Sequence, residues 1–420
     1  MLPYASIVLQ RYYKVTGWNE DNLYSNLTRA STSILDFSVP RGLHFHISKS
    51  PNPWFKTTYS MNALPSLNGS IGYIFTSCDL DVKGSADLRL KDVVERFRIY
   101  DVPRRPEGKP EQWLGGERRA DFLLYGRYYI PSSRLDALYS TRLSAQTQAL
   151  ISVISDPSTA LYARGSKGGT SLIGANNVMF NLQRDTGRWS TEYSWSADDG
   201  MLGARALYNF GALGDEEDTR ERNVRSRRVD EEEAMEGGLR GRFSAGAEVY
   251  FSAKEKSAGV STGLRFTTLP EPSSSDPNVY DPIQPPTALT AIFNPMMGHI
   301  SSAYTARVSR DLSLCSRFDF NVYSYESEWT MGAEWWIRKR IRKSNGSDKA
   351  LDVALLRLIG EASQIRGVVK ARMSTSSDVS LMWEGRLGKT LVSLGVVSDF
   401  SNRSKPIRAI GLELSYFSSE

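Results

Sequence analysis

The chain has 420 residues, of which 24% are charged and 40% hydrophobic, and its formal net charge is +5. This mild, dispersed positive charge does not indicate a nucleic-acid-binding protein. The two cysteines give neither a disulfide framework nor a paired metal-ligand motif. No run of about 18 apolar residues occurs, which excludes a transmembrane helix. A membrane β-barrel remains compatible with the composition, because only alternate residues of its strands face lipid.

Residues 1–40 are expected to form an amphipathic, helical segment. An apolar stripe at helical spacing comprises Tyr4, Ile7, Val8, Tyr12 and Val15. Pro3 suits the first turn of such a helix. The stretch lacks the early basic region and the small-residue cleavage site of a secretory signal.

From residue 41 to residue 420 the sequence alternates repeatedly between apolar and polar residues. In GRWSTEYSWSADDGMLGARALYNF (187–210), Trp189, Tyr193 and Trp195 fall on one side of the alternation and Glu192 on the other. ADDG then interrupts the pattern, which resumes at Leu202, so this stretch predicts two strands joined by a tight turn. We count about 17 to 19 such segments, many of about 9 to 12 residues. That length is typical of tilted membrane-spanning strands.

A large soluble all-β protein, such as a propeller or tandem sandwiches, would also alternate. No repeat of fixed period supports a propeller. Aromatic residues gather near segment ends, where the girdles of membrane barrels lie: Trp189, Trp195, Tyr208, Phe210, Trp335, Trp336, Tyr416 and Phe417. We therefore predict an all-β transmembrane barrel over residues 41–420, whose aromatic faces meet lipid.

Four stretches interrupt the strand pattern and are expected to be long loops: 79–120, 211–238, 270–286 and 338–360. The basic cluster RKRIRK (338–343) could meet anionic lipid headgroups or an acidic partner, or could simply be a charged loop end. The residues KALDVALLRLIG (349–360) have helical periodicity.

No constellation in the sequence predicts catalysis. His44 and His46 share a strand face, but polar residues facing a barrel lumen explain them better than a metal site. His299 stands alone, and GSKGGTS (165–171) does not have phosphate-loop spacing. We expect no enzyme, no metal and no cofactor. The C-terminal GLELSY (411–416) fits the end of the mitochondrial β-signal, although Ala409 occupies its polar position.

Several segments, in order along the whole chain, resemble a known family. They are MLPY (1–4), LDFSVP (35–40), NGSIGYIF (68–75), LYGRYYIPSSRLDAL (124–138), RLSAQTQ (142–148), FNPMMGHISSAY (293–304), FDFNVYS (318–324) and LMWEGRL (381–387). They are similar to the fungal mitochondrial distribution and morphology barrel, the outer-membrane subunit of the ER–mitochondria encounter structure (ERMES). The resemblance implies the architecture of the voltage-dependent anion channel, with about 19 strands and a short N-terminal helix inside the pore.

The resemblance also implies a location in the mitochondrial outer membrane at ER contact sites, and two roles. In ERMES the barrel would anchor lipid-transfer subunits, supporting phospholipid exchange, mitochondrial morphology and inheritance. In the sorting and assembly machinery (SAM) it would join the insertase and its accessory subunits and aid assembly of the import pore, with a small import-machinery subunit as a further partner. The family uses outward aromatic residues for partner contact: Tyr73 matches such a position, and Phe75 and Phe318 stand where the yeast relative has tyrosines.

Two other functions stay open on the sequence. The barrel could conduct metabolites, as its channel-like relative does, unless the N-terminal helix, the 79–120 stretch and the 338–360 insertion fill the lumen. A soluble binding protein is the third possibility, which extraction by alkaline carbonate without detergent would favour.

Overall fold

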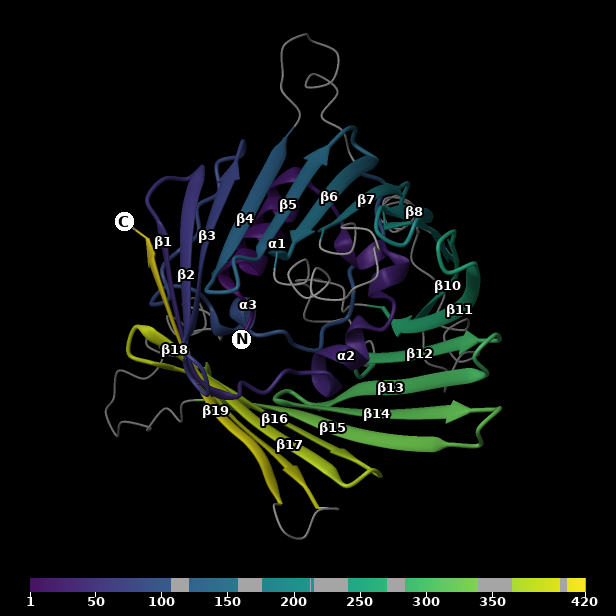
Figure 1. The fold of residues 1–420 in the computed structure, drawn as a ribbon. Coiled ribbons are helices and arrows are strands. Elements are labelled where there is room, and N and C mark those ends of the chain that lie inside the picture. Colours follow the sequence, from purple (N-terminus) through teal and green to yellow (C-terminus); the bar gives the residue numbers. More distant parts are fainter. Residues whose placement is uncertain are drawn as a thin grey trace, which may run out of the picture.

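The computed structural model describes residues 1–106, 121–157, 176–211, 213–214, 241–269, 284–338, 365–400 and 406–419. These form one closed sheet of 19 strands, seen along the barrel axis in Figure 1. The strands are β1 (Gly42–Ser50), β2 (Phe55–Leu64), β3 (Asn68–Thr76), β4 (Phe122–Ile130), β5 (Leu135–Arg142), β6 (Thr147–Ser155), β7 (Asn176–Asp185), β8 (Trp189–Ser196), β9 (Met201–Asn209), β10 (Gly241–Ser252), β11 (Ser257–Thr268), β12 (Thr287–Asn294), β13 (His299–Ser309), β14 (Leu312–Asn321), β15 (Ser327–Arg338), β16 (Ile365–Ser374), β17 (Asp378–Leu387), β18 (Thr390–Asp399) and β19 (Ile407–Ser419).

The barrel closes through one parallel strand pair. Consecutive strands are antiparallel, and β19 lies parallel to β1 with Gly42 opposite Gly411. An odd number of strands requires this, because the first and last strands then run in the same direction. The expected barrel of about 19 strands is confirmed, and ADDG forms the turn between β8 and β9.

The alternating residues separate an inner from an outer face. In β8, Ser190 and Glu192 face the lumen and are 1% and 2% exposed, whereas Trp189 and Tyr193 lie outside and are 52% and 54% exposed. Large apolar side chains on the outside and polar ones inside reverse the arrangement of a soluble domain and are typical of a barrel in lipid. Among the described residues no helix is long and apolar enough to cross a bilayer.

Two of the aromatic residues expected in the outer girdles lie inside instead. Trp336 and Phe417 are buried in the lumen, while Trp335 and Tyr416 face outwards. Neighbouring residues of a strand point to opposite faces, so only one member of each aromatic pair can meet lipid. The other member becomes part of the interior core.

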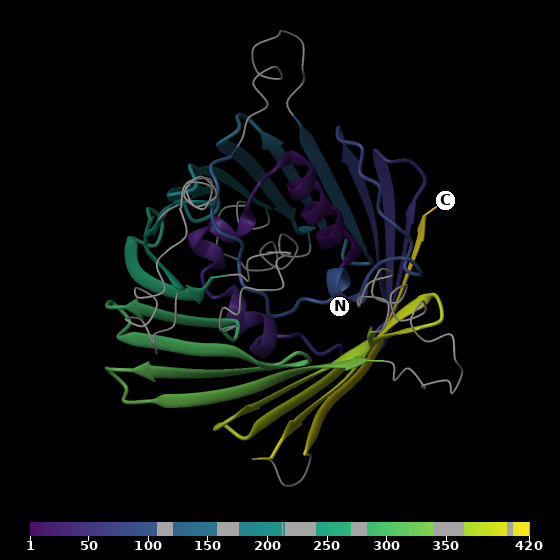
Figure 2. The same ribbon diagram turned by 180° about the vertical axis from the view of Figure 1, so that it is seen from behind.

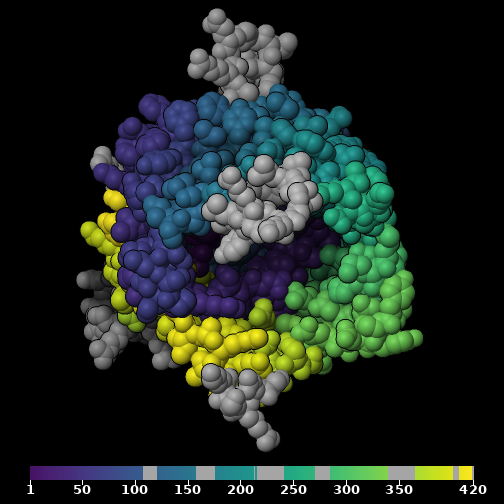
Figure 3. All heavy atoms as spheres, in the orientation of Figure 1, coloured from purple at the N-terminus to yellow at the C-terminus, as the bar shows by residue number. Residues whose placement is uncertain are grey.

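The N-terminal segment runs inside the barrel, as expected (Figures 1 and 2). It contains α1 (Tyr4–Thr16), the short 3₁₀ helices η1 (Glu20–Asn22) and η2 (Tyr24–Asn26), and α2 (Arg29–Leu35). Pro3 precedes α1, and Gly17 ends it in the left-handed conformation, with its amide donating to the Tyr13 carbonyl. This is a common way to stop a helix. In the space-filling view the purple N-terminal segment lies across the opening of the barrel (Figure 3).

The topology also sorts the loops between the two rims of the barrel. We call the rim where β1 ends and β2 begins rim A, and the opposite one rim B. Because consecutive strands are antiparallel, every connection that follows an odd-numbered strand lies at rim A. The four expected long loops follow β3, β9, β11 and β15, so all four emerge at rim A. The helix expected at 349–360 and the stretch at 165–171 lie outside the described residues.

Candidate functional site: the occupied lumen and the outer aromatic wall

A hydrophobic core fills the part of the lumen next to rim A. It joins α1 to the stretch that follows β3, which includes α3 (Leu90–Val93), and to inward side chains of the wall. Its members include Tyr4, Ile7, Val8, Tyr12 and Tyr13 from α1, Leu80, Val82, Leu88 and Val93 from the stretch, and Ile74, Trp336, Leu391 and Phe417 from the wall. The expected 79–120 loop thus folds back into the barrel over its described part, and its apolar residues bury the helix.

One residue of the expected helical stripe is not in this core. Val15 is 58% exposed, and Tyr13 is buried instead. The helix is packed from two sides, by the wall and by the stretch after β3, so residues 12 and 13 both contact the core while Val15 faces neither side. Burial raises the pKa of the Tyr4 phenol to about 12, and burial together with nearby Asp121 raises the pKa of the Cys78 thiol to about 11.

Polar wall residues hold the middle of the N-terminal segment. The Asn22 side chain donates to the Asp185 carboxylate at 2.7 Å and accepts from Asn209 at 2.6 Å. The Glu192 carboxylate accepts the Ser25 amide at 3.1 Å. Buried polar groups are costly unless they are bonded, so these contacts fix the segment against β7, β8 and β9.

Basic wall residues hold the C-terminal end of α2. Lys370, which is 2% exposed, donates to the Ser33 carbonyl at 2.7 Å. Arg372 donates to the Leu35 carbonyl at 3.1 Å, and the Arg317 guanidinium pairs with the Asp36 carboxylate at 2.8 Å. The last carbonyls of a helix have no partners within the helix and carry partial negative charge. Lys370 and Arg372 therefore provide hydrogen bonds to the last carbonyls of α2, and all three cations interact favourably with the negative end of its dipole.

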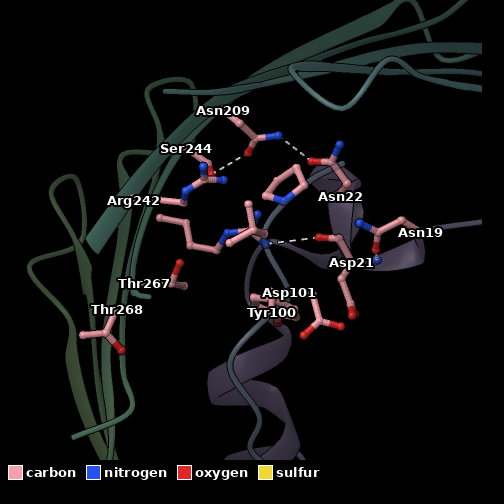
Figure 4. Close-up of a pocket in the computed structure, with 13 residues that line it drawn as sticks. Asn19, Asp21, Asn22, Tyr100, Asp101, Asn209, Arg242, Ser244, Thr267 and Thr268 are labelled. Atoms are coloured by element: carbon pink, nitrogen blue, oxygen red, sulfur yellow. Dashed lines mark hydrogen bonds between the residues drawn. The ribbon is translucent and has the colours of Figure 1, made fainter. Parts of the chain in front are cut away.

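A small polar cavity lies between η1, residues 100–103 and strands β9 to β11 (Figure 4). Arg265 lies across it: its guanidinium donates to the Asp21 carbonyl at 3.3 Å and sits 4.7 Å from the centre of the Tyr100 ring. The Asp21 carboxylate is already bound by Arg29 and Arg98, at 2.9 and 2.7 Å. The cavity measures about 20 Å³, enough for about one water molecule. It is too small for an organic substrate.

The three residues expected to contact partners lie on the outer face. Tyr73 is 50% exposed, and its ring stacks on Phe55 with centroids 5.9 Å apart. Phe75 lies two residues further along β3, and its ring is 5.9 Å from that of Phe122. Phe318 belongs to β14, eight strands away from β3 in the shorter direction round the barrel. The structure therefore brings Tyr73 and Phe75 together but places Phe318 on another side of the wall, as Figure 1 shows.

Each histidine contacts isolated polar groups rather than a ligand cluster. His44 bonds to the Asn62 side chain at 2.6 Å. His46 lies 3.5 Å from Glu413 of β19, which the parallel closure brings to the same lumen face, and His299 lies 4.0 Å from Asp319. Within the described ranges, no three His, Cys, Asp or Glu residues group as a metal site would require.

We call the N-terminal segment (residues 1–40) together with the described stretch after β3 (residues 77–106) the plug. The sequence did not single out the charged wall residues that hold this plug. Lys56, Glu334, Lys370 and Glu384 are all fully or nearly fully buried. Glu384 pairs with the buried N-terminal ammonium of Met1, and the Glu334 carboxylate accepts the Phe97 amide at 3.2 Å. The sequence could have indicated them only as charged residues at those alternate strand positions that face the lumen. That signal also marks ordinary solvated lumen residues, so it could not identify contacts with the plug.

Comparison with known proteins gives one consistent family. A family model described as mitochondrial distribution and morphology protein 10 matches residues 1–355 and 358–419. Proteins of that name from Postia placenta and Laccaria bicolor are 62% and 61% identical to this chain. One from Cryptococcus neoformans is 42% identical. Each of these alignments covers 100% of both chains.

Proposed function

Because the chain belongs to the mitochondrial distribution and morphology protein 10 family, we propose that it is a scaffold of the mitochondrial outer membrane that acts in mitochondrial distribution and morphology. It offers docking surfaces to other proteins and does not perform chemistry. The proposal extends to two assemblies: ERMES at ER contact sites, where the barrel supports phospholipid exchange, and the SAM complex, where it aids late assembly of the import pore.

The occupied lumen is the observation that supports a scaffold. The N-terminal segment and the stretch after β3 together build a core inside the barrel from apolar side chains that are almost completely buried. Buried charged side chains such as Lys370 bind this plug to the wall. A freely conducting pore gains nothing from such a core, whereas a rigid wall with loops at fixed positions benefits from it.

The two assemblies are assigned to different surfaces. The lateral wall around Tyr73 and Phe75 would bind the SAM insertase and its accessory subunits, because half-exposed aromatic rings on rigid strands suit protein contacts within a membrane. Rim A would bind the lipid-transfer subunits of ERMES, because four of the five long connections between strands lie there and only the one between β6 and β7 lies at rim B. Phe318 would serve a separate contact, and the small import-machinery subunit is a candidate for it.

Co-purification from fungal mitochondria in mild detergent tests the SAM surface. We expect Tyr73→Ala to lower recovery of the insertase several-fold while the barrel stays in carbonate-washed membranes. Tyr193→Ala is the matched control, because Tyr193 is an outward tyrosine of similar exposure, 54% against 50%, on a different strand. Equal recovery of the insertase with both variants would remove Tyr73 from the interface. Recovery of neither SAM nor ERMES subunits with the unaltered chain would reject the scaffold.

Metabolite conduction is the alternative function, and planar-bilayer recordings separate the two. The occupied lumen predicts a conductance far below that of an open barrel of 19 strands. A large and stable conductance of the full chain, passing organic anions, would favour the channel.

A further inference from the structure

Five basic residues meet where the lumen opens at rim A. Lys91 lies in α3 and Arg96 follows it. Arg307 is near the rim A end of β13, Arg310 is in the turn to β14, and Arg338 ends β15. The three strand elements are neighbours in the sheet and reach the same rim. Loop residues and wall residues thus bring five positive charges to one sector of the mouth.

Three of the five basic residues have no carboxylate beside them in the described part of the chain, and a fourth has one. Arg338 pairs with Asp311 at 2.5 Å. Lys91, Arg96 and Arg307 have no described carboxylate within 4.0 Å. The Arg307 guanidinium contacts the neutral Phe97 residue, donating to its carbonyl at 3.4 Å and lying 5.9 Å from the centre of its ring.

The nearest acids are engaged elsewhere. Asp92 faces Arg11 at 3.8 Å. The Glu334 carboxylate accepts the Phe97 amide and the Trp336 indole N–H, at 3.2 and 2.6 Å.

The positive charges act on one another. Burial lowers the pKa of the Lys91 ammonium, and the positive charges of Arg96, Arg338, Arg307 and Arg310 lower it further. Burial and the charges of Arg307 and Arg98 lower the pKa of the Arg96 guanidinium, against a smaller opposing effect of Glu334 and Asp92. Unpaired like charges in a partly buried setting are unfavourable unless an anion joins them.

We propose that Lys91, Arg96 and Arg307 bind the phosphate of an anionic phospholipid headgroup at the mouth of the lumen. Arginine and lysine are the usual phosphate partners, and Arg96 and Arg307 each offer a planar fork of donors. The site lies at the ends of membrane-spanning strands, which is the depth of lipid headgroups.

The outer face beside the site is suited to acyl chains. Val308 and Trp335 are 62% and 57% exposed there, and Trp335 lies opposite Leu312 in the β14–β15 pair. The site goes beyond the scaffold function and does not depend on it, because lipid binding at rim A needs neither SAM nor ERMES.

Lipid retention by the full chain tests the proposal. The purified protein is placed in phosphatidylcholine nanodiscs containing a small fraction of phosphatidic acid, and its bound lipid is measured by native mass spectrometry. We expect the double variant Arg96→Gln/Arg307→Gln to bind phosphatidic acid about 25-fold more weakly, since each basic residue near a membrane surface contributes roughly fivefold. Arg96→Lys/Arg307→Lys keeps both charges and is expected to retain most of the binding.

The matched control removes two charges at the opposite rim. Lys254 and Lys256 lie in the β10–β11 turn at rim B, and Lys254→Gln/Lys256→Gln should leave phosphatidic acid retention unchanged. The proposal fails if the two glutamine doubles lose retention equally, or if the rim A double binds like the unaltered chain. It also fails if a polyglutamate peptide displaces the lipid at low concentration, because the cluster would then be a site for acidic protein.

Discussion

Gly332 in β15 gives a direct test of the docking of α2 in the lumen. A Cβ atom on Gly332 would lie 2.6 Å from a Leu35 methyl carbon, 3.1 Å from a methyl carbon of Ile34 and 3.2 Å from the Ala371 carbonyl oxygen. Gly332→Val should therefore push α2 from the wall. The same change suits the strand itself, because β-branched residues favour extended backbone and glycine does not.

Overpacking of this kind costs about 1 to 3 kcal/mol. We expect the cost to fall on the docked state of α2 and to raise its undocked fraction about 5- to 150-fold. Cys315 is a native probe for that fraction: it is 3% exposed, belongs to the core beneath α2 and lies opposite Gly332 in the β14–β15 pair. Its alkylation in the folded barrel should accelerate by the same factor.

Two controls make the result decisive. Gly126→Val is the matched variant, because a Cβ on Gly126 would meet nothing within 4 Å, and it should leave the alkylation rate unchanged. Cys78 reports on the separate core around α1 and should keep its slow rate in Gly332→Val. Equal rates of Cys315 alkylation in the two valine variants would refute the docking geometry. Equal acceleration at both cysteines would point to general unfolding.

Three further outcomes follow from the plug. Lys370→Gln removes the charged donor to the Ser33 and Glu95 carbonyls, and each of these hydrogen bonds is worth about 1.5 to 3 kcal/mol. The variant should therefore accelerate Cys315 alkylation and raise the conductance of the reconstituted barrel. Unchanged conductance would argue against a plug held by Lys370. The Tyr4 phenol should ionise near pH 12 in the absorbance difference between the unaltered chain and Tyr4→Phe, and a midpoint near 10 would mean that its side chain is solvated. The Tyr4 phenol has a higher pKa when α1 is docked than when α1 is released. Docking of α1 should therefore be unaffected up to about pH 10 and weaken between about pH 10 and 12. The Cys78 thiol, with its pKa near 11, should react roughly two hundredfold more slowly at pH 8 than an unfolded thiol, and reaction at the unfolded rate would show an open core.

The sequence alone determined the architecture of this protein. In a strand, side chains alternate between the two faces, so the alternating pattern over segments of about ten residues predicted the outer faces and the turn at ADDG. It did not predict the long connection between β6, which ends at Ser155, and β7, which begins at Asn176. The outward placement of Tyr73, Phe75 and Phe318 follows from the same parity. Trp336 and Phe417 show why a cluster of aromatic residues does not by itself predict contact with lipid. Adjacent residues of a strand point to opposite faces, so one aromatic residue of each pair must face the lumen.

What fills the barrel, and which sites lie together, depends on contacts between distant parts of the chain. The segments of the plug are local helices and loops, whereas their partners, such as Lys370 for α2, stand more than 300 positions away in the chain. Strand periodicity fixes the direction of a side chain but not the distance round the barrel, so it could not separate Phe318 from Tyr73. Nor could it pair His46 with Glu413, because that contact exists only where the first and last strands meet. Closure of the sheet brings such residues together, and no local pattern encodes it.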